Sequence, residues 1–417
     1  MKIPRCKGAN DLMPQDMLRF RRIEEVFRTW CLAWGYKEIR TPTLEYLHLF
    51  TSAGTLTPEM LSRVYTFLDW DGWSGERVVL RPDGTIPTAR FYVENMLDVP
   101  VARLCYVENM FSFEGTGQKS RERWQCGAEL IGGTEPAGDA ELIMLALEIL
   151  NNLSTTPVSV KISHVGLFKT LLNEMGLDDE EQAHRLKEIL AGDTSILNEI
   201  ESQSPTVKRF LNLLLDLRGK SSGFMENLKS VLPKNLKAVK PAIEDLEQIA
   251  ELMDGMGQDY EIDFASGEGF EYYTGMVFQF YSNGKLLGNG GRYDELIPLV
   301  GGDSAPASGF ALFTERIDPV RIEEVEHGPV KILLNCKIEP IEGMKNLFEV
   351  ASVLRAEGYI VQIDFGEEKP VDYHWLVSCE KKGKQIRFSL TDMTTGEEQP
   401  GLSRKRLLEA LKAGATK

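Results

Sequence analysis

The sequence predicts an α+β protein with an antiparallel hairpin at its centre, helices around it and a small α/β domain at its C-terminus. Apolar residues alternate between Met276 and Phe280, which is the period of a strand with one buried face. Residues 16–35 carry apolar side chains at helical spacing. From Pro329 onward, strand and helix patterns alternate, as in a small, mostly parallel α/β unit.

Composition limits the class of protein. The chain has 417 residues, 42% of them hydrophobic, which predicts two or three domains with sizeable cores. It has no apolar run as long as the roughly 18 residues of a membrane span and no apolar signal core at its start, so we expect a cytoplasmic protein. Its six cysteines are scattered without a C-x-x-C pair, so we expect reduced thiols, no metal site and no cofactor.

Net charge argues against nucleic acid as the partner. Against 63 Asp and Glu, the chain has 47 Lys and Arg, a formal charge of −16. Proteins that bind RNA place cations against its phosphates, and these contacts supply most of the affinity. We therefore do not expect tRNA to bind; proteins and small molecules are the expected partners.

The central stretch, residues 264–316, carries the most information. Asn283-Gly284 predicts a tight hairpin turn, and Gly290-Gly291 allows close backbone approach. Residues Gly309 to Arg316 are expected to form a helix. Two interpretations are open: the floor of a small-molecule pocket, or a hairpin whose aromatic residues are only core.

Three segments here, EGFEYYTGMVFQF, GNGGRYDEL and SGFALFTER, resemble in this order the histidine-specific motifs and the third signature motif of histidyl-tRNA synthetases. The resemblance implies a class II aminoacyl-tRNA synthetase-like antiparallel sheet flanked by helices, which holds ATP and the amino acid on one face. It implies a core over residues 1–325 and a small α/β domain over 329–417 that resembles a reduced anticodon-binding domain.

The N-terminal part fits this family. The helix over 16–35 and the extended segment 37–42 resemble the first class II motif, whose proline, here Pro42, lies at a dimer interface. The resemblance therefore implies a homodimer. Residues 64–80 then predict a hairpin that turns near Asp71-Gly72.

A carboxylate and a hydroxyl follow the hairpin. Asp83 and Thr85 match the family positions that hold the α-amino group of histidine, and both side chains accept hydrogen bonds from an ammonium group. The alternative is that Asp83 only caps the helix that begins near Ile86.

Residues 101–133 predict strand, loop and strand, and resemble the second motif. The arginine that contacts the ATP α-phosphate in active synthetases is replaced by Ser112. Gln125 and Glu129 match positions that contact histidine. Arg121 and Arg123, expected in the loop, could restore a cation.

The next 100 residues have a different sequence pattern. After a strand at 158–168, a polar-rich helical pattern predicts an all-helical insertion over about 165–257, preceded by a helix over 139–150. A lone histidine at a strand end is more often structural, so we expect a structural role for His164.

The central stretch contains a second position, after Ser112, at which a family arginine is replaced. The family arginine four residues before the tyrosine pair is replaced by Glu268, while Tyr272, Tyr273 and Arg316 match the family. Two unit charges about 4 Å apart interact by about 4 kcal/mol at a dielectric near 20, and about 1.4 kcal/mol is tenfold in rate. With Ser112 and Glu268 together, adenylate formation should be crippled, and no residue is expected to be catalytic.

The C-terminal domain is expected to contain four strands, near 330–336, 359–365, 374–379 and 386–393, and helices over 343–357 and 404–413. Glu367-Glu368 and Glu397-Glu398 fall on expected loops. Such acidic loops disfavour RNA binding.

Loss of the aminoacylation residues resembles the regulatory subunits of short-form ATP phosphoribosyltransferase, the first enzyme of histidine biosynthesis. This resemblance implies a non-catalytic partner of the catalytic subunit, assembled as homodimers within a hetero-octamer, with L-histidine as a possible effector. Two alternatives stay open: a divergent histidyl-tRNA synthetase, and a synthetase paralogue that ligates another small molecule.

Overall fold

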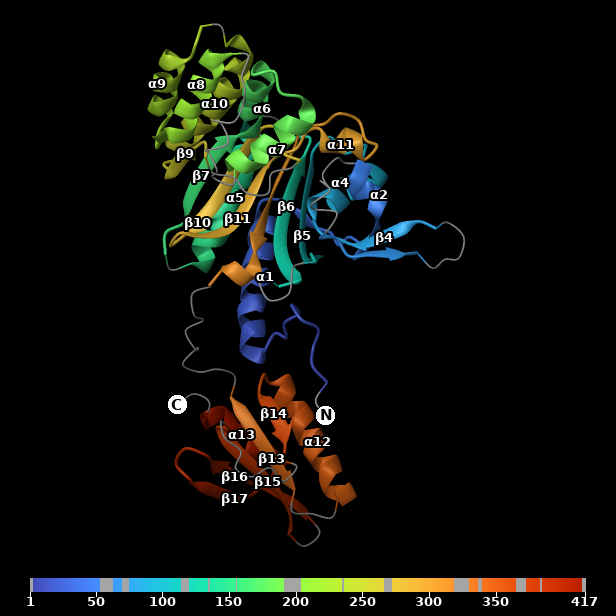
Figure 1. Cartoon of the computed structure of the whole chain (residues 1–417). Coiled ribbons are helices and arrows are strands. Elements are labelled where there is room, and N and C mark those ends of the chain that lie inside the picture. Colours follow the sequence, from blue (N-terminus) through green and yellow to red (C-terminus); the bar gives the residue numbers. More distant parts are fainter. Residues whose placement is uncertain are drawn as a thin grey trace. The chain divides into compact units, whose positions relative to one another are not determined.

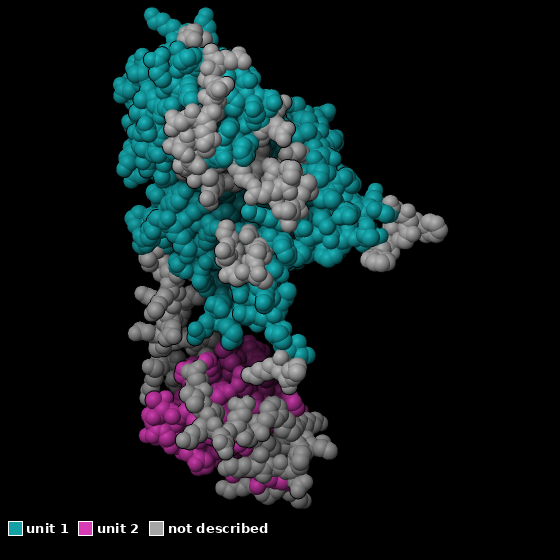
Figure 2. Space-filling model, viewed as in Figure 1, with its two compact units in different colours: residues 1–320 teal, residues 321–417 magenta. Residues whose placement is uncertain are grey.

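The computed structural model contains the expected large antiparallel sheet. The structure describes residues 3–52, 63–69, 75–113, 120–133, 136–154, 156–190, 204–234, 236–265, 272–318, 330–336, 340–364, 373–382 and 385–414. It divides into two compact units, residues 1–320 and 321–417 (Figure 2). The expected boundary near residues 325–329, the turn at Asp71-Gly72, Glu268 and Glu367-Glu368 lie outside the described residues.

Unit 1 contains a nine-stranded sheet in the order β1-β5-β6-β12-β11-β10-β7-β9-β8. Its middle six strands, from β5 to β7, are all antiparallel to their neighbours, whereas β1 and β9 pair in parallel with β5 and β7. The strands are β1 (Lys37–Glu38), β5 (Ala102–Phe111), β6 (Glu122–Ile131), β7 (Ser159–His164), β8 (Arg218–Gly219), β9 (Tyr260–Asp263), β10 (Met276–Ser282), β11 (Lys285–Arg292) and β12 (Ala307–Phe313). The class II synthetase-like α+β fold is therefore confirmed.

Helices cover this sheet. α1 (Pro14–Ala33) packs on α5 (Ala137–Leu153), and α5 packs on β6, β10 and β12. The indole of Trp34, just after α1, donates to Glu148 of α5 at 2.7 Å. Outside the helical insertion, the other described helices of unit 1 are α2 (Leu47–Ser52), α4 (Thr85–Asn95), α11 (Leu296–Leu299) and the 3-10 turn η3 (Thr314–Arg316).

The predicted insertion is helical. It contains α6 (Val165–Glu174), α7 (Asp179–Leu190), α8 (Pro205–Asp216), α9 (Ser222–Val231), η2 (Lys237–Val239) and α10 (Lys240–Gly255). Figure 1 shows α8, α9 and α10 gathered beside the β9 edge of the sheet. The predicted strand at 158–168 ends earlier than expected, because His164 accepts a hydrogen bond from the backbone N–H of Leu167 and starts α6.

The hairpin of β10 and β11 forms as predicted, with Asn283 and Gly284 both at positive φ in a two-residue turn. One expectation about it was wrong. We expected one buried face, but Val277 and Gln279 are buried as well as Met276, Phe278 and Phe280. A strand in the middle of a sheet that is covered on both sides has no solvent face.

The helix expected over Gly309–Arg316 is wrong. Residues 307–313 form β12, which pairs with β6 on one side and β11 on the other, and only Thr314–Arg316 make a helical turn. Backbone hydrogen bonds to two neighbouring strands outweigh local helical preference here.

A second, three-stranded sheet, β2-β4-β3, projects to one side of the large sheet (Figure 1). It consists of β2 (Leu44–Tyr46), β3 (Thr66–Leu68) and β4 (Arg77–Leu80). The antiparallel pairing of β3 with β4 agrees with the hairpin predicted for residues 64–80.

Unit 2 has its own sheet, in the order β14-β13-β15-β16-β17. Its elements are β13 (Lys331–Cys336), α12 (Pro340–Ala356), β14 (Ile360–Ile363), β15 (Trp375–Lys382), β16 (Gln385–Asp392), β17 (Glu398–Leu402) and α13 (Arg404–Gly414). Only β14, β13 and β15 are parallel, so the expected mostly parallel sheet is in fact mixed. Two residues separate β15 from β16, too few for a parallel crossover. Glu398 lies in β17, not in a loop.

We expect the two units to respond separately to core mutation, because the buried cluster around Leu334 in unit 2 contains no residue of unit 1. Leu334→Ala should destabilise unit 2 by about 2–5 kcal/mol through the cavity it leaves. Hydrogen exchange should then speed up in β13–β16 and stay unchanged in β5–β12. Equal acceleration in both units would contradict the separation.

Candidate functional site

The candidate site is built around the carboxyl group of Glu129 in β6. This side chain is fully buried. Three hydroxyl groups donate to it: Thr85 to Oε1 at 2.8 Å, Tyr106 to Oε1 at 3.2 Å and Tyr293 to Oε2 at 2.6 Å. The donors come from the first turn of α4, from β5 and from the residue after β11. Three separate elements therefore meet at one side chain.

Burial controls the charge of this group. Removal from water raises the pKa of Glu129 to about 8, and the negative charge of Asp83 acts in the same direction, while hydrogen bonds from Tyr293, Thr85 and Tyr106 oppose the shift. The carboxyl group is therefore largely protonated at neutral pH. A cationic group placed beside it would favour ionisation.

Glycines make the space that these side chains fill. A Cβ on Gly309 of β12 would lie 1.6 Å from Glu129 Oε2. A Cβ on Gly127 or Gly84 would lie 2.1 Å or 2.5 Å from the ring of Tyr106. Such distances are shorter than any real carbon contact, so the buried cluster requires glycine at these positions.

Asp83 makes the helix-end hydrogen bond that the sequence left open as one of its two roles, and it also contacts Tyr272. Its Oδ1 accepts from the N–H of Ile86 at 2.9 Å and caps α4, and its Oδ2 accepts from the Tyr272 hydroxyl at 3.2 Å. The Tyr272 hydroxyl also lies 3.3 Å from Thr85 Oγ1. Burial raises the pKa of Asp83. Asp83, Thr85, Glu129 and Tyr272 thus form one connected hydrogen-bond network.

The other two expected pocket residues lie beside this network. Tyr273 is buried, with its ring centroid 4.9 Å from that of Tyr272, and its carbonyl accepts from Lys169 Nζ at 3.1 Å. Gln125 is half-buried and lies on the same face of β6 as Glu129, four residues away along the strand.

A cation lies beside Ser112. Ser112 Oγ accepts a hydrogen bond from the Arg123 guanidinium at 3.0 Å. Arg123 lies in β6, not in the loop where we expected it, and Arg121 lies directly before β6, with its guanidinium 4.8 Å from the ring of Phe113. Arg316 stacks on Phe313, 4.7 Å from the ring centroid. Glu268 is outside the described residues.

A charged network that we did not predict lies behind the site. Arg292, at the end of β11, pairs with Asp139 of α5 and, at 2.8 Å, with Asp245 of α10. Asp245 also accepts from His164 Nε2 at 3.1 Å. Since His164 Nδ1 accepts the Leu167 N–H, Nε2 carries the proton. The expected structural role of His164 agrees with this geometry.

Sequence reasoning missed Tyr106 and Tyr293. Tyr106 lies opposite Gly127 in the β5–β6 pairing, and a glycine facing a tyrosine across two strands was the available signal. Tyr293 directly follows the double glycine and Arg292, but nothing local distinguishes a ligand-site tyrosine from a core one.

Comparison with known proteins assigns this arrangement to a family. The histidyl-tRNA synthetase family model matches residues 8–317. Two ATP phosphoribosyltransferase regulatory subunits from strains of Dehalococcoides mccartyi are 46% identical; the matches cover 94% and 90% of this chain and 95% and 91% of those proteins. The chain belongs to this regulatory-subunit family, within the histidyl-tRNA synthetases and their paralogues.

More distant members of the wider family match over the same length. The histidine–tRNA ligase of Archaeoglobus fulgidus is 33% identical over 95% of this chain and 97% of its own. A Bacillus halodurans crystal structure described as an ATP phosphoribosyltransferase regulatory subunit/histidyl-tRNA synthetase superposes with a TM-score of 0.74 at 26% identity, covering 92% of this chain and all of that one. Among the described residues, no helix has the length and apolar character needed to cross a membrane.

The glycine requirement can be tested directly. Gly309→Ala should destabilise unit 1 by about 3 kcal/mol, because the new methyl group displaces the Glu129 carboxyl group. Gly255→Ala at the end of α10, where a Cβ meets nothing within 4 Å, is the matched control and should be neutral or slightly stabilising. Urea denaturation measures both; equal effects would contradict the packing argument.

The raised pKa of Glu129 predicts a pH-dependent stability. The folded protein holds this proton more tightly than the unfolded chain, whose carboxyl pKa is near 4.5. The contribution is complete below about pH 4.5 and is lost as the pH rises through about 8. Glu129→Gln, neutral at every pH, should lose less stability than the wild type between about pH 5 and pH 8.5.

The matched control is Glu226→Gln on the exposed surface of α9. Its urea midpoint should follow the wild type at each pH. A Glu129→Gln protein that declines as steeply as the wild type would show that this carboxyl group is ionised in the folded protein.

Proposed function

We propose that this protein is a non-catalytic regulatory subunit that activates a short-form catalytic ATP phosphoribosyltransferase and mediates feedback by L-histidine. The observation that carries the proposal is the 46% identity to the Dehalococcoides mccartyi regulatory subunits over 94% of the chain. A match of that extent cannot be confined to unit 1, because residues 321–417 make up more than a fifth of the sequence.

The site supports a sensing role. Asp83, Glu129 and the hydroxyl groups of Thr85 and Tyr272 offer hydrogen bonds and negative charge to an amino acid. The chemistry of adenylate formation needs cations at the reacting phosphate, and serine and glutamate occupy two of the family arginine positions, 112 and 268. Such a pocket would bind histidine and leave it unchanged.

A bound ligand regulates an assembly only if it binds one state more tightly than another. We propose that homodimers of this protein assemble with catalytic subunits into a hetero-octamer in the cytoplasm, and that histidine shifts this assembly toward an inactive state. The net charge of −16 agrees with protein partners rather than tRNA.

The first experiment assays the short catalytic subunit of the same organism with and without this protein, and then titrates L-histidine. We expect strong activation that histidine reverses. Tyr272→Phe removes a hydroxyl that reaches Asp83 and Thr85, so it should weaken inhibition by histidine about tenfold without reducing activation. Tyr281→Phe, whose hydroxyl contacts only Gln279 among the described residues, is the control.

A divergent histidyl-tRNA synthetase is the second candidate, favoured by Arg123 beside Ser112 and by the 33% identity to the Archaeoglobus ligase. Histidine-dependent ATP–pyrophosphate exchange distinguishes the two. Clear turnover that Arg123→Ala abolishes would overturn the regulatory proposal; absence of activation and of co-elution with the catalytic subunit would also count against it.

A further inference from the structure

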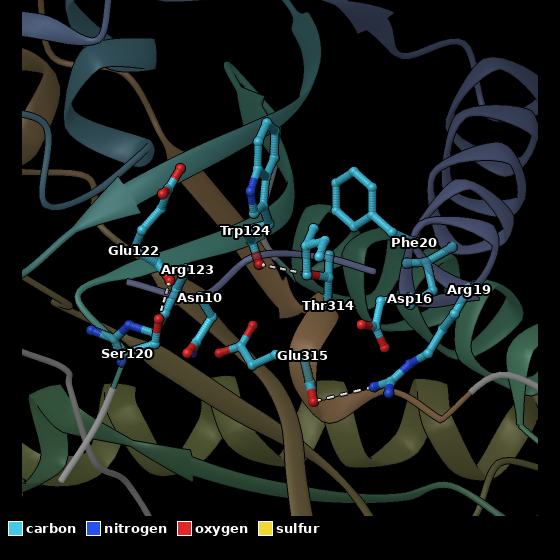
Figure 3. A pocket seen from close by; sticks show the side chains of 12 residues that line it. Asn10, Asp16, Arg19, Phe20, Ser120, Glu122, Arg123, Trp124, Thr314 and Glu315 are labelled. Carbon is cyan, nitrogen blue, oxygen red and sulfur yellow. Dashed lines mark hydrogen bonds between the residues drawn. The ribbon is translucent and has the colours of Figure 1, made fainter. Parts of the chain in front are cut away.

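A cavity lies at the start of β6, beside Trp124. It has a volume of about 540 Å³ and is formed by the N-terminal segment, α1, the start of β6 and η3 (Figure 3). Trp124 lines it, and strand alternation places Trp124 opposite Gln125 and Glu129. Trp124 therefore faces away from Glu129, whereas Arg123, which also lines the cavity, lies on the Gln125 face at the start of the strand.

The cavity has an apolar floor. Phe20 and Ile23 of α1 are buried there, and the rings of Phe20 and Trp124 meet edge to face with centroids 5.1 Å apart. Leu12 forms part of the wall and is 47% exposed, and its neighbour Met13 is 63% exposed. Apolar surface thus continues from the floor to the outside of the cavity.

The polar part of the lining offers negative charge. Asp16, Glu122 and Glu315 contribute carboxylates, and Figure 3 shows those of Asp16 and Glu315 pointing into the cavity. Asp16 Oδ2 accepts from the Met13 N–H at 3.0 Å and Glu122 Oε1 accepts from Asn109 Nδ2 at 2.8 Å, so Glu315 has the least engaged carboxylate of the three. The two lining arginines also have partners. Arg19 donates to the carbonyl of Ile317 at 2.7 Å and pairs with Asp318, and Arg123 donates to Ser112.

We propose that this cavity is a docking site for the catalytic subunit, and that it receives a lysine or arginine side chain with an apolar neighbour. The cation would lie among the carboxylates of Asp16 and Glu315, and its aliphatic stem or neighbour would cover Phe20 and Trp124. The exposed Leu12 and Met13 favour a polypeptide over a small molecule, because a small ligand would leave them uncovered. This inference rests on the proposed regulatory function.

The site is placed to communicate with the amino-acid pocket. The carbonyl of Trp124 accepts from Thr314 Oγ1 at 3.1 Å, and the next residue, Gln125, faces the pocket. A docked side chain and a bound amino acid would therefore contact opposite faces of the same short stretch of β6, which is a direct route for coupling.

The test measures binding of the purified short catalytic subunit to the wild-type protein and to Glu315→Lys. Glu315 is exposed, and its carboxylate has no hydrogen-bond partner among the described residues, so the fold should tolerate the change. We expect binding about tenfold weaker, chiefly through slower association, with the difference shrinking as salt is added. Glu226→Lys on α9 is the matched control and should bind like the wild type.

Two further measurements keep the test decisive. Leu12→Ser removes apolar wall without changing the charge of the site and should also weaken binding about tenfold. Hydrogen exchange of the complex should protect peptides that cover residues 10–23 and 120–126. If a variant unfolds, the exchange result on the wild-type complex decides.

The outcomes separate the two proposals. Two results with an activating wild-type protein would overturn the docking site and leave the regulatory function standing. One is unchanged binding of Glu315→Lys and Leu12→Ser, and the other is absence of protection of these peptides. Equal losses in Glu315→Lys and Glu226→Lys would overturn it too, because the effect would then be one of overall charge. No binding by the wild-type protein would overturn both.

Discussion

The enclosure of one carboxyl group by three hydroxyl groups is the constraint on which the site depends. Glu129 pairs with Gly309 across β6 and β12, and Tyr106 pairs with Gly127 across β5 and β6. A shift of one residue in either pairing would turn these side chains to the opposite face of the sheet. The chemistry of the site therefore depends both on the register of the antiparallel strands and on the positions of the glycines.

Much of the fold and of the candidate site could be predicted from the sequence. Several motifs in a fixed order along the chain indicate which distant segments lie together, and local patterns do not. The α+β class and the turn at Asn283-Gly284 are confirmed, and four of the residues expected at the site, Asp83, Thr85, Glu129 and Tyr272, share one hydrogen-bond network. The helix expected over 309–316 failed because glycine, serine and apolar residues at that spacing fit a helix locally, and only the flanking strands β6 and β11 decide otherwise. Tyr106 and the Arg292 network were missed because their partners are distant in sequence.

Charge is unevenly distributed across the candidate site. Carboxyl groups and hydroxyls occupy its centre, whereas its arginines lie at the edge and already contact Ser112 or Phe313. Burial of Glu129 opposes a fixed negative charge, so its ionisation depends on what binds beside it. A group of this kind responds to the charge of its ligand.

The contact between Arg292 and Asp245 has a consequence for how such a chain can evolve. Asp245 belongs to the helical insertion, yet it forms an ion pair with Arg292 of the central sheet and accepts a hydrogen bond from His164. A shorter relative that lacked α10 would leave a buried guanidinium with half of its countercharge, at a cost of several kcal/mol. We therefore expect the insertion and the arginine at position 292 to be gained or lost together.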